Sequence, residues 1–243
     1  MRNYRAEAIV LRTHKLGEAD RIITLLTREK GKIRAVAKGV RRTRSKFGAR
    51  LEPFSRVELF IAPGKNLDII TQAESLNVYG ESLALDYPLW TIGQTILETA
   101  DRIASEESVP AETQYLLLVG ALRSLTEKEH DGMLVLNAYL LRALSLAGYA
   151  TVLSECAICG IAGIQPFFNV PSGGALCSDH RQPGSVAPKA ESIGLLLALL
   201  QGDWEVADQA TEGQVREASG LIAAYTQWHL ERGLRSLPLV DRQ

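Results

Sequence analysis

The sequence contains few residues of the kinds that cross-link a chain or anchor it in a membrane. Only three of its 243 residues are cysteine, and an odd number of thiols argues against a disulfide framework. Its longest apolar runs, such as residues 194–200 and 133–136, fall far short of the roughly 18 residues that a membrane-spanning helix needs. The N-terminal residues lack the long apolar region of a signal peptide. We therefore expect a cytoplasmic protein with no membrane partner.

Motifs that mark common catalytic sites are also missing. Neither Gly31-Lys32 nor Gly64-Lys65 has the preceding glycine or the following Ser or Thr of a phosphate-binding loop, and neither G-x-S-x-G nor H-E-x-x-H occurs. Nothing assembles a base, a nucleophile and an oxyanion site, so we expect no enzyme. One alternative is a metal-dependent enzyme using Glu18 and Asp20, but no third ligand lies near them in sequence, which favours two residues flanking a turn.

The charge of the chain is unevenly distributed along its length. The whole chain has a formal net charge of -1. Residues 1–80 contain 17 Lys and Arg against 8 Asp and Glu, a charge of +9, while residues 81–243 contain 10 against 20, a charge of -10. Such asymmetry indicates two parts with different partners.

The hydrophobic pattern divides the chain at the same place. Five short β-branched or alternating runs, at residues 6–13, 21–27, 31–38, 57–62 and 66–73, predict strands. Five strands in so short a length favour an OB-fold barrel, with a small sandwich as the alternative. After residue 80, apolar residues at three- and four-residue spacing predict helices from residue 88 to about 103 and at 112–126, 133–147, 189–201 and 212–234. The predicted fold is α+β, with a barrel domain at 1–80 and a helical domain at 81–243.

All three cysteines lie in one segment that interrupts the helical pattern at about residues 150–185. The motif Cys156-x2-Cys159-x17-Cys177-x2-His180 has the spacing of a zinc ribbon, in which two tight turns direct four ligands at one ion. A closed set of four ligands favours one structural Zn²⁺. Asp179 or water are alternatives to His180 as the fourth ligand, and three buried free cysteines are the alternative to a metal site.

The strongest binding signal is the basic segment at residues 28–50, with ten Lys and Arg and one acidic residue. This density is typical of proteins that bind the phosphates of nucleic acids. Gly39 and Gly48 predict a mobile loop. Phe47 is a candidate for stacking on an unpaired base, or for packing against the barrel. The candidate DNA-binding residues are Arg34, Lys38, Arg41, Arg42, Arg44, Lys46 and Arg50.

Several motifs together resemble the bacterial RecO family of recombination mediators. They are Val36-Ala37-Lys38-Gly39-Val40-Arg41, Leu51-Glu52-Pro53-Phe54, Leu141-Arg142-Ala143-Leu144, Gly148-Tyr149, Cys156-x2-Cys159-Gly160, Phe167-Phe168, Gly173-Gly174 and Cys177. The resemblance covers nearly the whole chain. It departs from the family's four-cysteine pattern at His180, which stands where the fourth cysteine falls.

This resemblance implies an OB-fold followed by a helical domain with a zinc-ribbon insertion, in a nucleoid-associated bacterial protein without catalytic activity. It implies binding of single- and double-stranded DNA, annealing of complementary strands and loading of RecA, an indirect partner, onto strands coated by single-strand-binding protein. The implied direct partners are RecR, sometimes RecF, and the acidic C-terminal tail of single-strand-binding protein. Arg142 matches a helical motif of the family, and either the acidic tail or a structural ion pair would suit it. An RNA-binding or ribosome-associated module is the alternative, since a barrel with a zinc ribbon also suits RNA.

Overall fold

The computed structural model describes residues 2–104, 112–230, 234 and 236–240. The chain forms two compact units, Met1–Glu127 and Lys128–Gln243. The predicted domain boundary at residue 80 separates a DNA-binding domain from a helical domain. This functional division stays a prediction. Three helices that follow residue 78 belong to the same compact unit as the strands.

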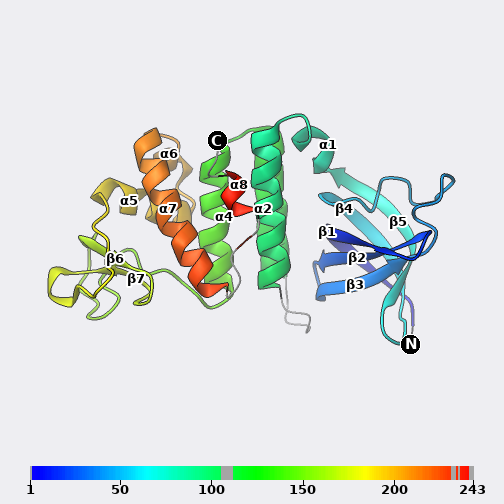
Figure 1. The fold of residues 1–243 in the computed structure, drawn as a ribbon, viewed down its shortest axis with the longest axis horizontal. Coiled ribbons are helices and arrows are strands. Elements are labelled where there is room, and N and C mark those ends of the chain that lie inside the picture. The colour runs from blue at the N-terminus through cyan, green and yellow to red at the C-terminus, as the bar shows by residue number, and fades with distance from the viewer. Residues whose placement is uncertain (1, 105–111, 231–233, 235, 241–243) are drawn as a thin grey trace. The chain divides into compact units, whose positions relative to one another are not determined.

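Five strands of the first unit close into a barrel in the order β1-β2-β3-β5-β4 (Figure 1). All neighbouring pairs are antiparallel except β3 and β5, which pair in parallel at Ala35–Asp68 and Val36–Ile69. This topology confirms the predicted OB-fold barrel and excludes the sandwich. The strands are β1 Tyr4–Leu16, β2 Asp20–Thr27, β3 Gly31–Ala37, β4 Ser55–Ala62 and β5 Asp68–Val78.

The barrel encloses an apolar core because its strands alternate between the interior and the outside. In β4 the inward residues Val57, Leu59 and Ile61 are all buried. In β1, however, four successive residues from Ala8 to Leu11 are buried, since helices α2 and α3 contact the outer face of this strand. These helices therefore cover the outer face of β1 as well.

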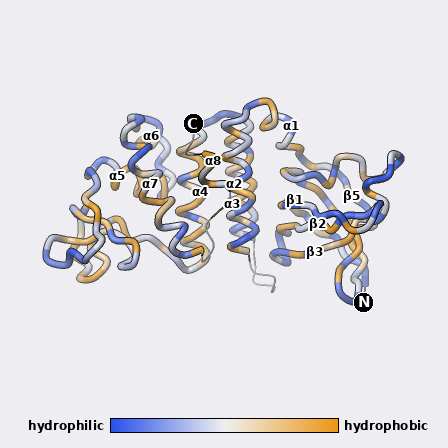
Figure 2. The backbone as a smooth tube through the Cα atoms, viewed as in Figure 1, coloured by the Kyte–Doolittle hydropathy of each residue, from blue (hydrophilic) through white to orange (hydrophobic). Residues whose placement is uncertain are grey.

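Residues 38–54, which we call the β3–β4 segment, form a series of turns between those strands. Figure 2 shows hydrophilic residues along much of it, yet Val40, Phe47 and Leu51 are buried in the barrel core. These three residues anchor the segment to the barrel core. The expectation of a mobile loop included this packing only as an alternative for Phe47.

The segment ends at Phe54, a buried non-glycine residue with a φ of 70°. The Phe54 ring lies 4.8 Å from the Trp90 ring, centroid to centroid. A Cβ at Gly93 would lie 2.9 Å from Cε1 of Phe54, so only glycine leaves room for the ring. Phe54 thus joins the end of the β3–β4 segment to helix α2.

The helices of the first unit are α1 Tyr79–Leu83, α2 Tyr87–Ile103 and α3 Glu112–Glu127. The Asp86 side chain caps α2 by accepting a hydrogen bond from the Leu89 N–H. Pro88 stands in the first turn, where its missing N–H costs no helical hydrogen bond. These bounds confirm the helices predicted from residues 88 and 112.

The second unit contains the remaining helices, α4 Gly132–Leu146, α5 Ala190–Gln201, α6 Trp204–Ala207, α7 Glu212–His229 and α8 Leu237–Val240. Asp131 caps α4, and Thr211 forms a capping box with Gln214 at the start of α7. Helix α7 ends at His229, before the predicted end at 234, and residues 231–233 of that prediction lie outside the described residues. Between α4 and α5 stands the small hairpin of β6 Phe167–Asn169 and β7 Gly174–Leu176.

Candidate nucleic-acid interface and metal centre

The seven predicted DNA-binding side chains are all exposed on the barrel unit. Among the residues that the structure describes, none of them forms an ion pair with a carboxylate. We call them the cationic set: Arg34 on β3, and Lys38, Arg41, Arg42, Arg44, Lys46 and Arg50 in the β3–β4 segment. Exposed cations without an internal counter-charge are free to exchange their solution counterions for phosphates.

Two other basic side chains of residues 28–50 already form ion pairs. Arg28 NH2 lies 2.7 Å from Glu112 Oε1, and Lys32 Nζ lies 3.6 Å from Asp101 Oδ1. Both acids belong to the helices that follow the barrel. Arg28 and Lys32, which are not among the seven predicted DNA-binding residues, are thus paired within the barrel unit.

Backbone carbonyls hold three members of the cationic set in place. Arg41 NH1 donates to the carbonyl of Glu18 at 2.8 Å, and Arg50 NH1 donates to the carbonyl of Phe47 at 3.2 Å. Lys46 Nζ donates to the carbonyl of Thr71 at 2.7 Å. A carbonyl carries no net charge, so these contacts orient the cations and leave their charge available to an anion.

Phe47 packs in the barrel core and does not face solvent. Its exposed fraction is 1%, and Lys46 Nζ lies 5.0 Å from the centroid of its ring. The structure thus confirms the packing alternative, because a buried ring cannot stack on a base.

Four side chains of the second unit form a candidate metal centre. The ligand atoms of Cys156, Cys159, Cys177 and His180 all lie within 4.8 Å of one another. The Sγ atoms of Cys159 and Cys177 are 3.9 Å apart, and Cys177 Sγ lies 3.2 Å from His180 Nδ1. Three thiols and one imidazole suit the ligand preference of zinc. Among the described residues this is the only grouping of three or more His, Cys, Asp or Glu that could hold a metal.

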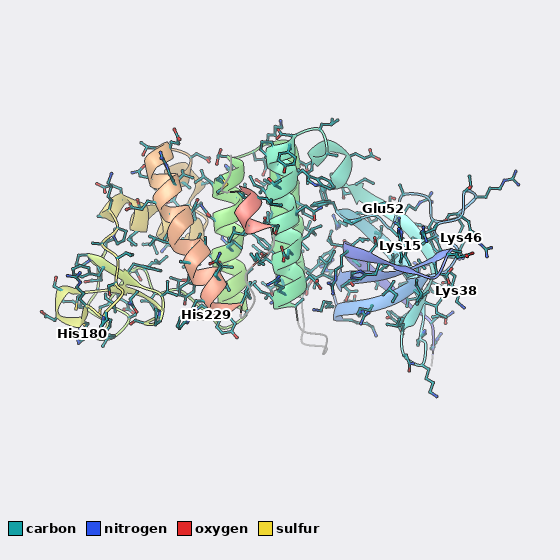
Figure 3. All side chains as sticks on the ribbon, viewed as in Figure 1. Lys15, Lys38, Lys46, Glu52, His180 and His229 are labelled. Carbon is teal, nitrogen blue, oxygen red and sulfur yellow. The ribbon has the colours of Figure 1, made fainter. Side chains whose placement is uncertain are left out.

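Local backbone geometry brings the ligands together. Gly160 has a φ of 72°, and its N–H donates to the Cys156 carbonyl at 2.8 Å, which closes the first turn. A short 3-10 helix, Ser178–His180, forms the second turn and directs His180 back toward Cys177. Figure 3 labels His180 in the second unit. The alternative ligand Asp179 is exposed and does not belong to the group.

The electrostatic environment of the thiols differs between the two residues of the first pair. Burial disfavours the Cys156 thiolate, but the backbone N–H groups of Cys159, Cys177 and Ile158 outweigh it and lower the pKa of Cys156 to about 6. The Ile161 N–H favours the Cys159 thiolate, but burial and the neighbouring sulfurs outweigh that bond and raise the pKa of Cys159. One ready thiolate beside further thiols suits the binding of a cation.

Arg142 has a structural partner within the second unit. Its Nε and NH2 atoms donate to the Leu199 carbonyl at 3.0 and 2.6 Å, near the end of α5. Burial lowers its pKa. A carbonyl is its partner here, and neither the predicted ion pair nor the acidic tail is needed to explain its position.

Sequence reasoning did not single out Lys15 and Arg21, because both precede the basic run. The register of the barrel places them opposite each other on β1 and β2. A prediction of how these two strands pair would have shown this position. Asp20, the candidate of the enzymatic alternative, accepts a hydrogen bond from the Gly39 N–H at 2.7 Å. It therefore acts as a turn residue. This is the role predicted for it if it does not bind a cation.

Comparison with known proteins gives matches along nearly the whole chain. The family model described as Recombination protein O N terminal matches residues 1–79, and Recombination protein O C terminal matches residues 84–238. Similar proteins include DNA repair protein RecO of Thermobifida fusca, 56% identical over 98% of each chain. That of Nocardioides sp. is 57% identical over 98% of this chain and 99% of its own. That of Streptomyces coelicolor is 55% identical over the same shares.

Proposed function

Since the chain belongs to the RecO family of DNA repair proteins, we propose that it binds single- and double-stranded DNA through the cationic set. The observation that carries this proposal is the sorting of charges on the barrel unit. Other cations of this unit, such as Arg28, Lys32 and Arg56, have carboxylate partners, while the seven members of the cationic set have none among the described residues. A surface of this kind attracts phosphates without regard to base sequence.

The same contacts explain how the protein would anneal complementary strands. Two DNA strands repel each other, and cations that neutralise their phosphates lower this repulsion while the bases remain free to pair. With Phe47 buried, binding rests on phosphate contacts, which leaves the pairing edges of the bases unobstructed. Annealing breaks no covalent bond, so we propose a role that needs no catalytic residue.

We propose that the second unit provides a structural zinc site and protein contacts. Cys156, Cys159, Cys177 and His180 would hold one Zn²⁺ with no ligand position left for a substrate. When bound, the ion would cross-link the two turns that carry its ligands. Residues 128–243 contain 8 Lys and Arg against 12 Asp and Glu, a net charge of -4, which disfavours DNA over most of their surface and suits partner proteins.

The proposed partners are RecR, the C-terminal tail of single-strand-binding protein and, in some pathways, RecF, with RecA loaded as the outcome. Arg142 stays a candidate for the acidic tail, although its contact with the Leu199 carbonyl would have to be shared or given up. We propose that this work takes place in the cytoplasm, at the nucleoid. Within the described residues no helix is long and apolar enough to span a membrane.

The test is annealing of two complementary oligonucleotides, each coated with single-strand-binding protein, in the absence of ATP. We expect the protein to accelerate duplex formation well above the rate of the coated strands alone. No acceleration would contradict the proposed function. A parallel competition between DNA and RNA of one sequence separates the proposal from an RNA-binding module, because a strong preference for RNA would favour that alternative.

A further inference from the structure

Two basic residues outside the cationic set face each other across the first two strands of the barrel. Lys15 of β1 and Arg21 of β2 are Cα partners in the antiparallel register. Residues directly opposite in such a pair have Cβ atoms about 4.5–5.5 Å apart, and like charges there destabilise the sheet. An anion bound between the two side chains would therefore relieve the repulsion of their charges.

In the free protein this anion is a carboxylate of the β3–β4 segment. Arg21 NH1 lies 2.5 Å from Glu52 Oε1, while Lys15 is exposed and has no ion pair among the described residues. The Glu52 side chain retains 50% of its exposure, so solvent and solutes reach the ion pair. Exposed ion pairs of this kind add little to stability, which makes the carboxylate easy to displace.

This ion pair lies beside the cationic set. Figure 3 shows Lys15 and Glu52 at the same end of the barrel as Lys38 and Lys46. Arg41 donates to the carbonyls of Gly17 and Glu18, in the turn that joins Lys15 to Arg21 along the chain. A strand bound to the cationic set would therefore pass close to Lys15 and Arg21.

We propose that Lys15 and Arg21 form an additional phosphate-binding site, and that Glu52 occupies it in the free protein as an internal substitute for phosphate. The inference rests on the proposed DNA binding and extends it. A nucleic-acid phosphate replaces the Glu52 carboxylate on Arg21 and is shared with Lys15. The guanidinium of Arg21 suits this exchange, because it binds carboxylate and phosphate with the same geometry.

The exchange sets the affinity of the barrel for DNA. In the wild type, binding at this site releases cations from DNA but also exposes the Glu52 carboxylate, which attracts a cation in return. In the Glu52→Gln variant nothing competes with the phosphate and no carboxylate is released. The variant is therefore expected to bind more tightly and with a steeper dependence on salt.

The test measures the Kd of fluorescein-labelled oligothymidylate over a series of NaCl concentrations for full-length variants. Glu52→Gln should bind several-fold more tightly than the wild type, with the slope of log affinity against log salt steeper by up to about 0.7, the value of one single-strand phosphate. Glu18→Gln is the matched control, since it removes the same charge from the turn between Lys15 and Arg21, and among the described residues the Glu18 carboxylate forms no ion pair with Arg21. The double variant Arg21→Gln/Glu52→Gln should lose the gain.

Four results would overturn the inference. An equal gain in Glu18→Gln and Glu52→Gln would mean that only overall charge matters. Retention of the gain in the double variant would mean that Arg21 does not bind the phosphate. Absence of salt-sensitive binding in every variant would end the proposed function as well, whereas salt-sensitive binding that ignores Glu52 would end this inference alone. Circular dichroism of each variant confirms that the barrel is folded.

Discussion

Lys38 and Arg42 are two exposed members of the cationic set for which the structure shows no carboxylate partner. Replacing both with alanine should weaken DNA binding to a similar degree for all sequences, because phosphate contacts do not depend on the base. The slope of log affinity against log salt should become shallower by about 1.4, or about 0.7 per phosphate on single strands. Titration of labelled DNA at several salt concentrations measures both effects. Arg216→Ala, which removes an exposed cation from α7, is the control and should change neither.

Glu7 makes the stability of the barrel unit depend on pH. Burial disfavours its charged form, but hydrogen bonds from Tyr115 and Arg56 outweigh burial and lower the pKa of Glu7. The Tyr115 hydroxyl lies 2.8 Å from Glu7 Oε1, and Arg56 Nε lies 2.7 Å from it. A lowered pKa in the folded protein means that the stabilisation is present above the unfolded pKa and is lost as the pH falls through the folded value.

The Glu7→Gln variant should therefore be less stable than the wild type at neutral pH by about 2 kcal/mol, the scale of a hydrogen bond to a charged group. The difference should shrink below the ordinary pKa of glutamate and nearly vanish in stronger acid, where the wild-type carboxylate is also protonated. Urea unfolding at a series of pH values measures it. A difference that stays constant across that range would contradict the account.

For single residues, the sequence predicted the members of the cationic set but not the ion pairs of the basic residues beside them. The density of Lys and Arg identified the segment at residues 28–50. The seven candidates drawn from it leave out Arg28 and Lys32, but the sequence did not show their partners Glu112 and Asp101, which lie 84 and 69 residues further along the chain. Only folding brings those charges together.

Among the elements, the two turns of the second unit carry four side chains that could hold one metal ion. Cys156→Ser and His180→Ala should each lower bound zinc and reduce the stability of the second unit, because each removes one of four ligands. Asp179→Ala should retain zinc, since Asp179 lies outside the ligand group. Elemental analysis of protein purified without chelator measures the metal content. Zinc retained in His180→Ala but lost in Asp179→Ala would assign the fourth ligand to Asp179.

The packing of the β3–β4 segment on α2 depends on one glycine. In Gly93→Ala the new Cβ would lie 2.9 Å from Phe54 Cε1 and 3.2 Å from Leu83 Cδ1, so the buried ring must shift. We expect a loss of about 1–3 kcal/mol in the free energy of unfolding, as for other overpacked cores. Gly220→Ala, in α7 with no atom within 4 Å of the new Cβ, is the control and should stabilise by up to about 1 kcal/mol. Urea unfolding of both variants makes the comparison, and equal effects would contradict the packing account.

The long elements could be predicted from periodicity, while the short ones could not. Five strands and five helices follow from the period of their apolar residues, and the structure contains all ten. Helices α1 and α6 have five and four residues, too few for a helical period to show. In the β3–β4 segment the packing of Phe47 was one of two alternatives, while that of Val40 and Leu51 was missed, since they follow neither period.

For the whole molecule, the unequal charge is the property on which the predicted partners depend. The net charge of -1 combines +9 over residues 1–80 with -10 over residues 81–243. On the barrel unit, Asp101 and Glu112 from the helices neutralise basic residues on its outer face, and the cationic set remains. The charge sum predicted a polyanion as partner, and the ion pairs decide which side chains are free to meet it.

The central claim, that the cationic set binds nucleic-acid phosphates, is tested most directly by the salt dependence of binding to single-stranded DNA. If about five of the seven cations meet a phosphate, log affinity should fall with log salt with a slope near -3.5, or about 0.7 per phosphate. Removing all seven charges while the barrel remains folded should abolish most of that slope. A flat response of the wild-type protein to salt would contradict the account.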